Sequence, residues 1–337
     1  MAHALFMARR PGGRYTAAGC AGLLAAGTLV FGGAAEAAAQ PTCFGVPATI
    51  QAQPGVPTTG TPGNDVIVGT SGHDSIDGLG GDDLICGLDG NDLLFGGLGD
   101  DQIDGGAGGD DITGDVEALA GNAIGGGNDH LYGGDGGDFM VGDSFAHSGD
   151  AEGAGDDVLM GGPGQDELIG DCLSSRNARG SGGDDFLDVG TGGGEAATGD
   201  HVVNSPRGGT ASGSGNDRIF GSDGFSGGPG FDDTLVGDSV VPHIPPTAGN
   251  DVISGRGGDD LVFGDNANLP RPTEVYPSRT IGTAGGDDDM SGADGVDTLR
   301  AGPGNDSLNG GPDAPDYCNG EAGTDRATEC EILRRIP

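Results

Sequence analysis

A nine-residue repeat constrains the fold of this chain more than any other feature. From residue 61 the sequence reads TPGNDVIVG, TSGHDSIDG, LGGDDLICG, LDGNDLLFG, GLGDDQIDG and GAGGDDITG. Each block has Gly at its third and ninth positions, Asp at its fifth and Ile or Leu at its seventh. The Gly content, 76 of 337 residues, would by itself suggest disorder. A disordered segment has no reason to keep an aliphatic residue in register, so the repeat predicts an ordered, repetitive structure.

These blocks resemble the RTX, or hemolysin-type, calcium-binding nonapeptide family over roughly residues 61–310, with interruptions. The resemblance implies an all-β fold, a parallel β-roll or β-helix solenoid, and several bound Ca²⁺ ions. In this family each ion lies between successive turns on one edge of the solenoid. Carried over to this chain, one ion would bridge the turns of Asp65 and Asp83, and another those of Asp74 and Asp92.

The chemistry of a single block favours the same structure. A short strand directs the seventh-position side chain to one side, and the glycine-rich half turns through conformations that most residues avoid. Such a turn exposes carbonyl oxygens beside an Asp carboxylate, and hard oxygen ligands suit Ca²⁺. The alternative is that these Asp residues only form turns and confer solubility, but stacked bare carboxylates would repel. With two blocks per coil, residues 18 apart stack: Asp65, Asp83 and Asp101 on one edge, and Asp74, Asp92 and Asp110 on the other.

After residue 114 the blocks continue in pairs separated by insertions. We expect each coil there to extend a loop from one edge, and loops such as 242–246 and 270–277 to form the surface that a specific partner contacts. Glu195 stands where Asp is expected, and Phe231 is an extra residue near the next turn. The candidate calcium ligands over the whole repeat are Asp65, Asp74, Asp83, Asp92, Asp101, Asp110, Asp129, Asp138, Asp157, Asp166, Asp185, Asp217, Asp233, Asp251, Asp260, Asp288, Asp297 and Asp306.

A further Asp follows the last Gly of each pair, where the chain leaves for its insertion. Two roles are open for this residue. It could be bridged to its neighbours by cations, or it could accept hydrogen bonds from the N–H groups of the loop. A solvated Asp at a loop start is the simpler alternative. The residues concerned are Asp115, Asp143, Asp171, Asp200, Asp238 and Asp265.

The sequence before the repeats predicts a cleaved secretory signal over residues 1–39. Arg9, Arg10 and Arg14 precede a short apolar run and a small-residue cleavage pattern. A membrane anchor is the alternative, but this run is short and rich in Ala and Gly, and no later segment is apolar enough to span a bilayer. The expected divisions that follow are an N-terminal cap segment (40–60), an uninterrupted β-roll (61–114), a β-roll with insertions (115–310) and a C-terminal disulfide cap (311–337).

Five Cys residues remain after the signal, which suits an oxidising, extracellular location. Cys318 and Cys330 enclose a short tail, so we expect them to pair. Cys86, at the eighth position of its block, points away from the core and is available to Cys43 in a docked N-terminal segment. Cys172 is then an unpaired loop residue and a candidate for an intermolecular bond.

Charge narrows the possible partners. The chain has 53 acidic residues against 14 Arg and no Lys, for a net charge of -39. A face that binds nucleic acid or anionic lipid must be basic, so neither is an expected partner. Catalytic motifs are weak: HExxH is absent, and the GFSGG match at 224–228 has no strand–helix context. We therefore expect a secreted, non-enzymatic calcium-binding structural or surface protein, or else an adhesin that presents its loops to a cell-surface or matrix partner.

Overall fold

The computed structural model describes residues 40–204, 210–223, 233–241, 247–267, 285–313 and 315–336. The expected signal segment (1–39), Phe231 and the loops at 242–246 and 270–277 lie outside the described residues. Strands and turns make up the described part of the chain, which contains no helix of a length and hydropathy that would cross a membrane.

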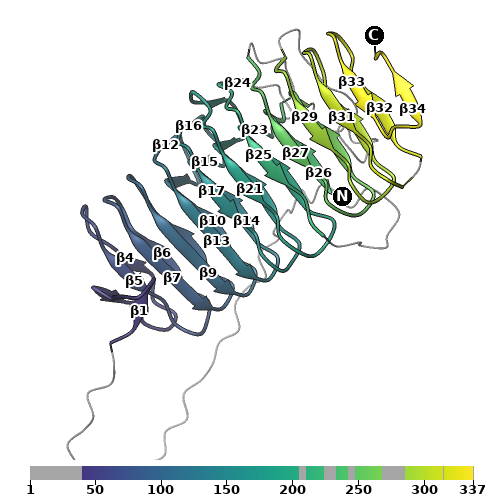
Figure 1. The fold of residues 1–337 in the computed structure, drawn as a ribbon. Coiled ribbons are helices and arrows are strands. Elements are labelled where there is room, and N and C mark those ends of the chain that lie inside the picture. Colours follow the sequence, from purple (N-terminus) through teal and green to yellow (C-terminus); the bar gives the residue numbers. More distant parts are fainter. Residues whose placement is uncertain are drawn as a thin grey trace, which may run out of the picture. The chain divides into compact units, whose positions relative to one another are not determined.

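Two parallel sheets of twelve strands each carry the fold (Figure 1). Each coil gives one strand to each sheet, so neighbours within a sheet are separated in sequence by a strand of the other. The first sheet contains β3 (Ile50–Gln51), β5 (Val66–Val68), β7 (Leu84–Asp89), β9 (Gln102–Ala107), β13 (His130–Asp135), β17 (Val158–Met160), β21 (Phe186–Asp188), β25 (Arg218–Phe220), β27 (Val252–Ser254), β29 (Asp289–Ser291), β31 (Ser307–Asn309) and β33 (Arg326–Thr328). The second contains β4 (Thr58–Thr59), β6 (Ser75–Asp77), β8 (Leu93–Phe95), β10 (Asp111–Thr113), β14 (Phe139–Val141), β18 (Glu167–Ile169), β22 (Ala196–Thr198), β26 (Thr234–Val236), β28 (Leu261–Phe263), β30 (Thr298–Arg300), β32 (Tyr317–Asn319) and β34 (Ile332–Arg334).

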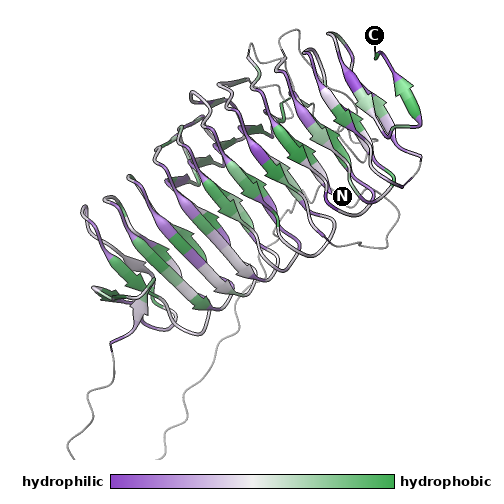
Figure 2. Cartoon of the chain, in the orientation of Figure 1, coloured by the Kyte–Doolittle hydropathy of each residue, from purple (hydrophilic) through white to green (hydrophobic). Residues whose placement is uncertain are grey.

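The seventh-position residues form the core between these sheets. Ile67 pairs in register with Ile85, which pairs in turn with Ile103, and all three are fully buried. In the facing sheet Ile76 pairs in register with Leu94, and both side chains are fully buried. Figure 2 shows the resulting pattern, with hydrophobic colour at the strand centres and hydrophilic colour toward the turns. The predicted parallel β-roll is confirmed, because the aliphatic register of the sequence becomes the register of both sheets.

The turns use the conformational freedom of glycine at the third position of the block. Gly81 and Gly99 have φ of 107° and 134°, in the region that most side chains avoid. The chain can therefore reverse direction within a few residues, and each reversal brings the fifth-position Asp back to the edge of the sheets.

The insertions are more regular than the loops expected from the sequence. Four successive insertions pair with one another and form two additional parallel sheets. Small residues stack in register inside them, including Ala123, Ala151 and Ala178, and give these sheets a separate core. Each insertion starts from the same edge of the roll, one coil after the last, so equivalent backbone groups come together and the insertions hydrogen-bond to each other. The strands are β11 (Glu117–Ala118), β15 (Phe145–Ala146), β19 (Leu173–Ser174) and β23 (Val202–Val203) in one sheet, and β12 (Ala123–Ile124), β16 (Ala151–Glu152), β20 (Ala178–Arg179) and β24 (Ala211–Ser212) in the other.

The N-terminal segment both covers and extends the solenoid. Strands β1 (Thr42–Cys43) and β2 (Val46–Pro47) form an antiparallel pair, and Cys43 is joined to Cys86 by a disulfide. The following strands, β3 and β4, pair with β5 and β6. Residues 40–60 therefore supply the first strand of each large sheet in addition to a covering hairpin.

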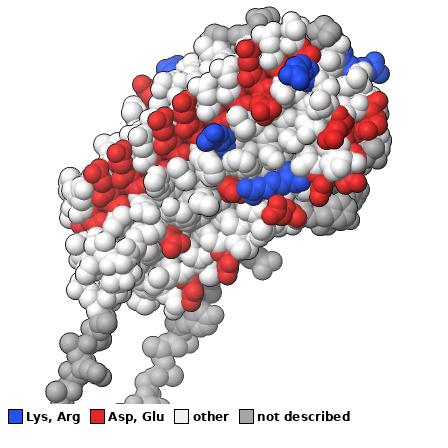
Figure 3. All heavy atoms as spheres, viewed as in Figure 1, with Lys and Arg blue, Asp and Glu red and all other residues white. Residues whose placement is uncertain are grey.

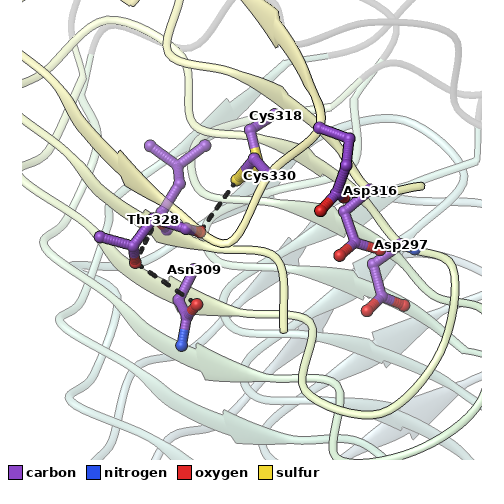
Figure 4. Close-up of a disulfide and its surroundings, with 8 residues drawn as sticks. Asp297, Asn309, Asp316, Cys318, Thr328 and Cys330 are labelled. Atoms are coloured by element: carbon purple, nitrogen blue, oxygen red, sulfur yellow. Dashed lines mark hydrogen bonds between the residues drawn. A yellow bond between two sulfur atoms is a disulfide. The ribbon is translucent and has the colours of Figure 1, made fainter. Parts of the chain in front are cut away.

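The C-terminal segment is a correction to the expected division at residue 310. Strands β32, β33 and β34 continue both large sheets, with Cys318 in register with Leu299. Cys318 is joined to Cys330 as expected, but this disulfide lies within the last coils and does not hold a separate cap (Figure 4). The repeat was hidden at this end because Cys and Ala replace Ile and Leu at the core positions.

Cys172 is also a correction. It is the free cysteine of the described residues, but its side chain is fully buried among the small residues of the insertion core. An intermolecular bond at this position is therefore excluded in the folded protein, since the thiol does not reach the surface.

Candidate metal centre

The fifth-position residues stack into two columns, one at each edge of the large sheets. In both columns the backbone N–H of one residue donates to the side chain of the residue in the next coil, over 2.7–3.2 Å. We call them the first and second aspartate columns. The first contains Asp65, Asp83, Asp101, Asp129, Asp157, Asp185, Asp217, Asp251, Asp288, Asp306 and Asp325; the second contains Asp74, Asp92, Asp110, Asp138, Asp166, Glu195, Asp233, Asp260, Asp297 and Asp316.

All the candidate ligands expected from the sequence lie in these two columns. Three further members, Glu195, Asp316 and Asp325, were not among them. Asp316 stacks next to Asp297, and the two side chains lie one above the other beside the disulfide in Figure 4. The N–H of Asp297 donates to Oδ1 of Asp316 over 2.9 Å. Asp316 and Asp325 each stand two residues before a core position, and that spacing is the signal that could have identified them.

One carboxylate oxygen of most column members is buried without a hydrogen-bond donor. In Asp83, for example, Oδ1 accepts the N–H of Asp65, whereas Oδ2 has no partner. Asp65, Asp74 and Asp233 differ, since each accepts a backbone N–H at Oδ2; in Asp74 it is Oδ1 that is buried without a donor. The buried Oδ2 atoms without a donor include those of Asp83, Asp92, Asp101, Asp110, Asp129, Asp138, Asp157, Asp166, Asp185, Asp217, Asp251, Asp288, Asp297, Asp306, Asp316 and Asp325.

Backbone carbonyl oxygens converge on these same carboxylates. A side chain at Gly78 would collide with both Asp83 Oδ2 and the carbonyl oxygen of Gly96. The ninth-position Gly is required here because two oxygens approach its Cα, and not because of a positive φ. An equivalent pair of oxygens, one from an Asp side chain and one from a backbone carbonyl, lies beside Gly87 and the other ninth-position glycines. Each turn therefore presents one carboxylate oxygen and at least one carbonyl oxygen to a common space.

Burial makes these carboxylates poor acids. It raises the pKa of Asp83 to about 6, that of Asp101 to about 7 and that of Asp129 to about 11, although the backbone hydrogen bond to each acts in the opposite direction. Neighbouring Asp charges add to the rise. A folded state at neutral pH therefore needs either protons or cations along the columns.

Side chains alone do not complete a metal site. Over the described residues, no three Asp, Glu, His or Cys side chains converge as a group that could hold a metal ion. Any ion at the columns must therefore take several ligands from the backbone. That demand fits Ca²⁺, which accepts six to eight oxygen ligands, including carbonyls, in flexible geometry. The donor set consists of hard oxygens and suits Ca²⁺ better than a transition metal.

The surface beside the first column is also acidic. The residue before each column member stacks as well, with the N–H of Asn128 donating to Asp100 and that of Asp184 donating to Asp156, at 2.9 and 3.0 Å. These side chains are exposed. Figure 3 shows acidic side chains gathered in rows with few Arg among them. The surface therefore supplies little positive charge to offset the negative charge of the buried carboxylates.

Comparison with protein families agrees with this geometry. The model of the RTX calcium-binding nonapeptide repeat (four copies) matches residues 59–94, 87–116, 125–146, 153–171, 212–225, 247–268, 283–315 and 291–327. These ranges cover more than half of the chain and follow the two columns. The chain belongs to the RTX calcium-binding nonapeptide repeat family, and its β-roll is a calcium-binding one. No curated protein matches it by sequence.

Proposed function

We propose that the protein is a secreted, non-enzymatic structural or surface protein whose β-roll folds as it binds several Ca²⁺ ions. The observation that supports this proposal is the series of buried Oδ2 atoms without donors in the two aspartate columns. The column carboxylates and the carbonyls of ninth-position glycines would hold the ions. Bound Ca²⁺ would supply the positive charge that these oxygens lack.

The energetics favour folding coupled to binding. The core contains about one aliphatic residue for each block of nine, whereas ordering the backbone costs about 1–2 kcal/mol per residue. Stacked carboxylates add repulsion to that cost. A ligand that binds only the folded chain stabilises it by linkage, and a structural metal can supply most of the folding free energy.

Two features support an extracellular location. The disulfides Cys43–Cys86 and Cys318–Cys330 would persist in an oxidising compartment. Calcium sites in extracellular modules have dissociation constants of about 0.1–1 mM, so the roll would stay unfolded where free Ca²⁺ is low.

The non-enzymatic part of the proposal is supported by burial. Asp171, Cys172 and His201 are neighbours and resemble a catalytic group, with His201 Nδ1 3.5 Å from Asp171 Oδ2. All three side chains are fully buried. A substrate cannot approach a thiol enclosed in this way.

A calcium titration followed by circular dichroism and calorimetry tests the proposal. We expect the β-sheet signal to develop cooperatively with Ca²⁺, together with the release of heat and uptake of several ions per chain. A chain that keeps its β-sheet signal and compactness in excess chelator at neutral pH would contradict it.

An adhesin remains the second candidate because the insertion sheets expose apolar residues. Leu119 and Ile124, in and beside the first insertion strands, are 75% and 60% exposed. Sedimentation with cell-wall or matrix preparations, in Ca²⁺, would compare the wild type with a Leu119→Ser, Ile124→Ser variant. Binding by the wild type that the variant loses would favour the adhesin.

A further inference from the structure

A third set of buried carboxylates lies where each coil passes into its insertion. We call Asp115, Asp143, Asp171, Asp200, Asp238 and Asp265 the junction column; all six side chains are fully buried. Their backbones stack directly, since the N–H of Asp143 donates to the carbonyl of Asp171 over 3.1 Å, and that of Asp171 to the carbonyl of Asp200 over 3.2 Å. This backbone stacking runs from Asp115 to Asp238, although the junction column lies outside the nonapeptide pattern.

The later half of the junction column caps the returning chain. Oδ1 of Asp200 accepts the N–H of Gly215 over 2.9 Å, and Oδ1 of Asp238 accepts the N–H of Gly249 over 2.7 Å. Oδ2 of Asp238 also accepts from Asn266 Nδ2 over 3.2 Å. Both oxygens of Asp238 thus have donors, and its role is structural.

Asp115, Asp143 and Asp171 are different, because neither oxygen of any of these three side chains has a hydrogen-bond donor. Asp115 is the first member of the column, whereas Asp143 and Asp171 each stack between two other junction residues. Other carboxylates act on Asp143: the side chains of Asp115 and Asp171 contact it, and the charge of Asp157 also raises its pKa. Asp171 likewise faces Asp185 and Asp200. Burial, followed by these neighbouring charges, raises the pKa of both groups well above its usual value.

The nearby histidine does not neutralise this charge. His201 Nδ1 lies 3.5 Å from Asp171 Oδ2, but it accepts the N–H of Cys172 over 3.3 Å. Its Nε2 lies 3.1 Å from the carbonyl of Ser212, so that nitrogen carries the proton. Burial lowers the pKa of His201 to about 4 and keeps the ring neutral.

Protons alone satisfy this arrangement poorly. A protonated carboxyl supplies one O–H donor, so a run of carboxyls still leaves buried acceptors unmatched. A divalent cation contacts several oxygens at once and removes two charges. Backbone oxygen is also at hand, since a side chain at Gly153 would collide with both the Asp143 side chain and the carbonyl oxygen of Gly125.

We propose that Asp143 and Asp171 together bind a divalent cation, Ca²⁺ in calcium-containing medium, at a site separate from the nonapeptide turns. Two carboxylates offer up to four oxygens, and backbone carbonyls or water complete the coordination. The negative charges of Asp157 and Asp185 strengthen the attraction. An ion here ties the insertion sheets to the main roll, so that the insertions become ordered together with the coils.

The test counts ions in the intact protein. Wild type, Asp143→Asn/Asp171→Asn and Asp238→Asn are saturated with Ca²⁺, and bound calcium per chain is measured by equilibrium dialysis with elemental analysis. Asn keeps the shape of the side chain and removes its charge. We expect the double variant to bind at least one ion fewer than the wild type and Asp238→Asn to bind the same number, because Asp238 already has donors at both oxygens.

The outcomes distinguish a failure of the junction site from a failure of the proposed function. The junction site rests on the proposed function only for the identity of the ion. Wild type that binds no calcium would overturn both. Wild type that binds calcium and a double variant that binds equally many ions, with an unchanged midpoint, would overturn the junction site alone. Should the double variant fail to fold, Asp143→Asn alone is compared with Asp238→Asn in the same way, and an equal ion count again overturns the site.

Discussion

The backbone N–H of Asp65 donates to Oδ1 of Asp83 over 2.7 Å, from one coil to the next. This contact fixes the carboxylate in the sheet edge and leaves Oδ2 directed at the space shared with the Gly96 carbonyl. The proposed ligand is therefore oriented by the stacking of coils. Because the contact recurs along both columns, the proposed calcium sites would form together with the solenoid.

The pH dependence of the calcium-free chain follows from the raised pKa values. The pKa of Asp83 and Asp92 rises to about 6, and that of Asp166 and Asp306 to about 7, all from 3.8. A carboxyl whose pKa is higher in the folded chain than in the unfolded chain stabilises the fold when it is protonated. That contribution is complete at pH values below the unfolded pKa and is lost as the pH rises through the folded pKa. In chelator, we expect β-sheet signal near pH 4 and its loss between about pH 5 and 8. Circular dichroism across this range checks it; a calcium-free chain most stable at alkaline pH would contradict it.

Two glycines provide a matched test of the oxygen arrangement. A β-carbon at Gly78 would collide with Asp83 Oδ2 and the Gly96 carbonyl, whereas one at Gly63 meets nothing within 4 Å. We expect Gly78→Ala to raise the calcium midpoint by about tenfold, equivalent to about 1.4 kcal/mol, through loss of one site's geometry. Gly63→Ala should titrate like the wild type. Calorimetric titration of both variants gives the comparison, and equal midpoints would show that the carbonyl–carboxylate contact is not a ligand set.

The repeat gave a reliable guide to the fold because one block determines both local conformation and register. The aliphatic residues at the seventh position predicted the core. The Asp residues at the fifth position predicted every column member that belongs to a regular block. The pattern is uninformative where it degrades: Asp316 and Asp325 precede Cys318 and Ala327 in place of Ile or Leu, so the sequence predicts a cap there and not further coils. Prediction of the insertion sheets failed for another reason. Most of the buried residues in their core are Ala, which carries no strong strand preference, so the insertion sequences give little indication of strands.

The adjacent residues Asp100 and Asp101 allow the effect of a proposed calcium ligand to be distinguished from that of a surface charge. Asp101 is buried with Oδ2 lacking a donor, whereas Asp100 is exposed and lies in the surface row. Asn at either position removes the same charge and retains an acceptor. We expect Asp101→Asn to bind one ion fewer or to need several-fold more Ca²⁺, and Asp100→Asn to differ little, because surface charge is screened by salt. Titrations at physiological ionic strength decide this, and equal losses in both variants would assign the effect to general electrostatics.

Cys172 reports on the insertion core. Its side chain is fully buried, and burial raises the pKa of the thiol well above its usual value, with Asp143 adding to the rise. The reactive species is the thiolate, so the folded protein should resist thiol reagents. In chelator the chain unfolds and the thiol reaches solvent with an ordinary pKa, so labelling should accelerate by at least about a hundredfold. Mass spectrometry of the labelled protein, without reductant, would show modified Cys172 and intact Cys43–Cys86 and Cys318–Cys330 disulfides. Rapid labelling of Cys172 in saturating Ca²⁺ would mean that the insertion sheets open independently of the main roll.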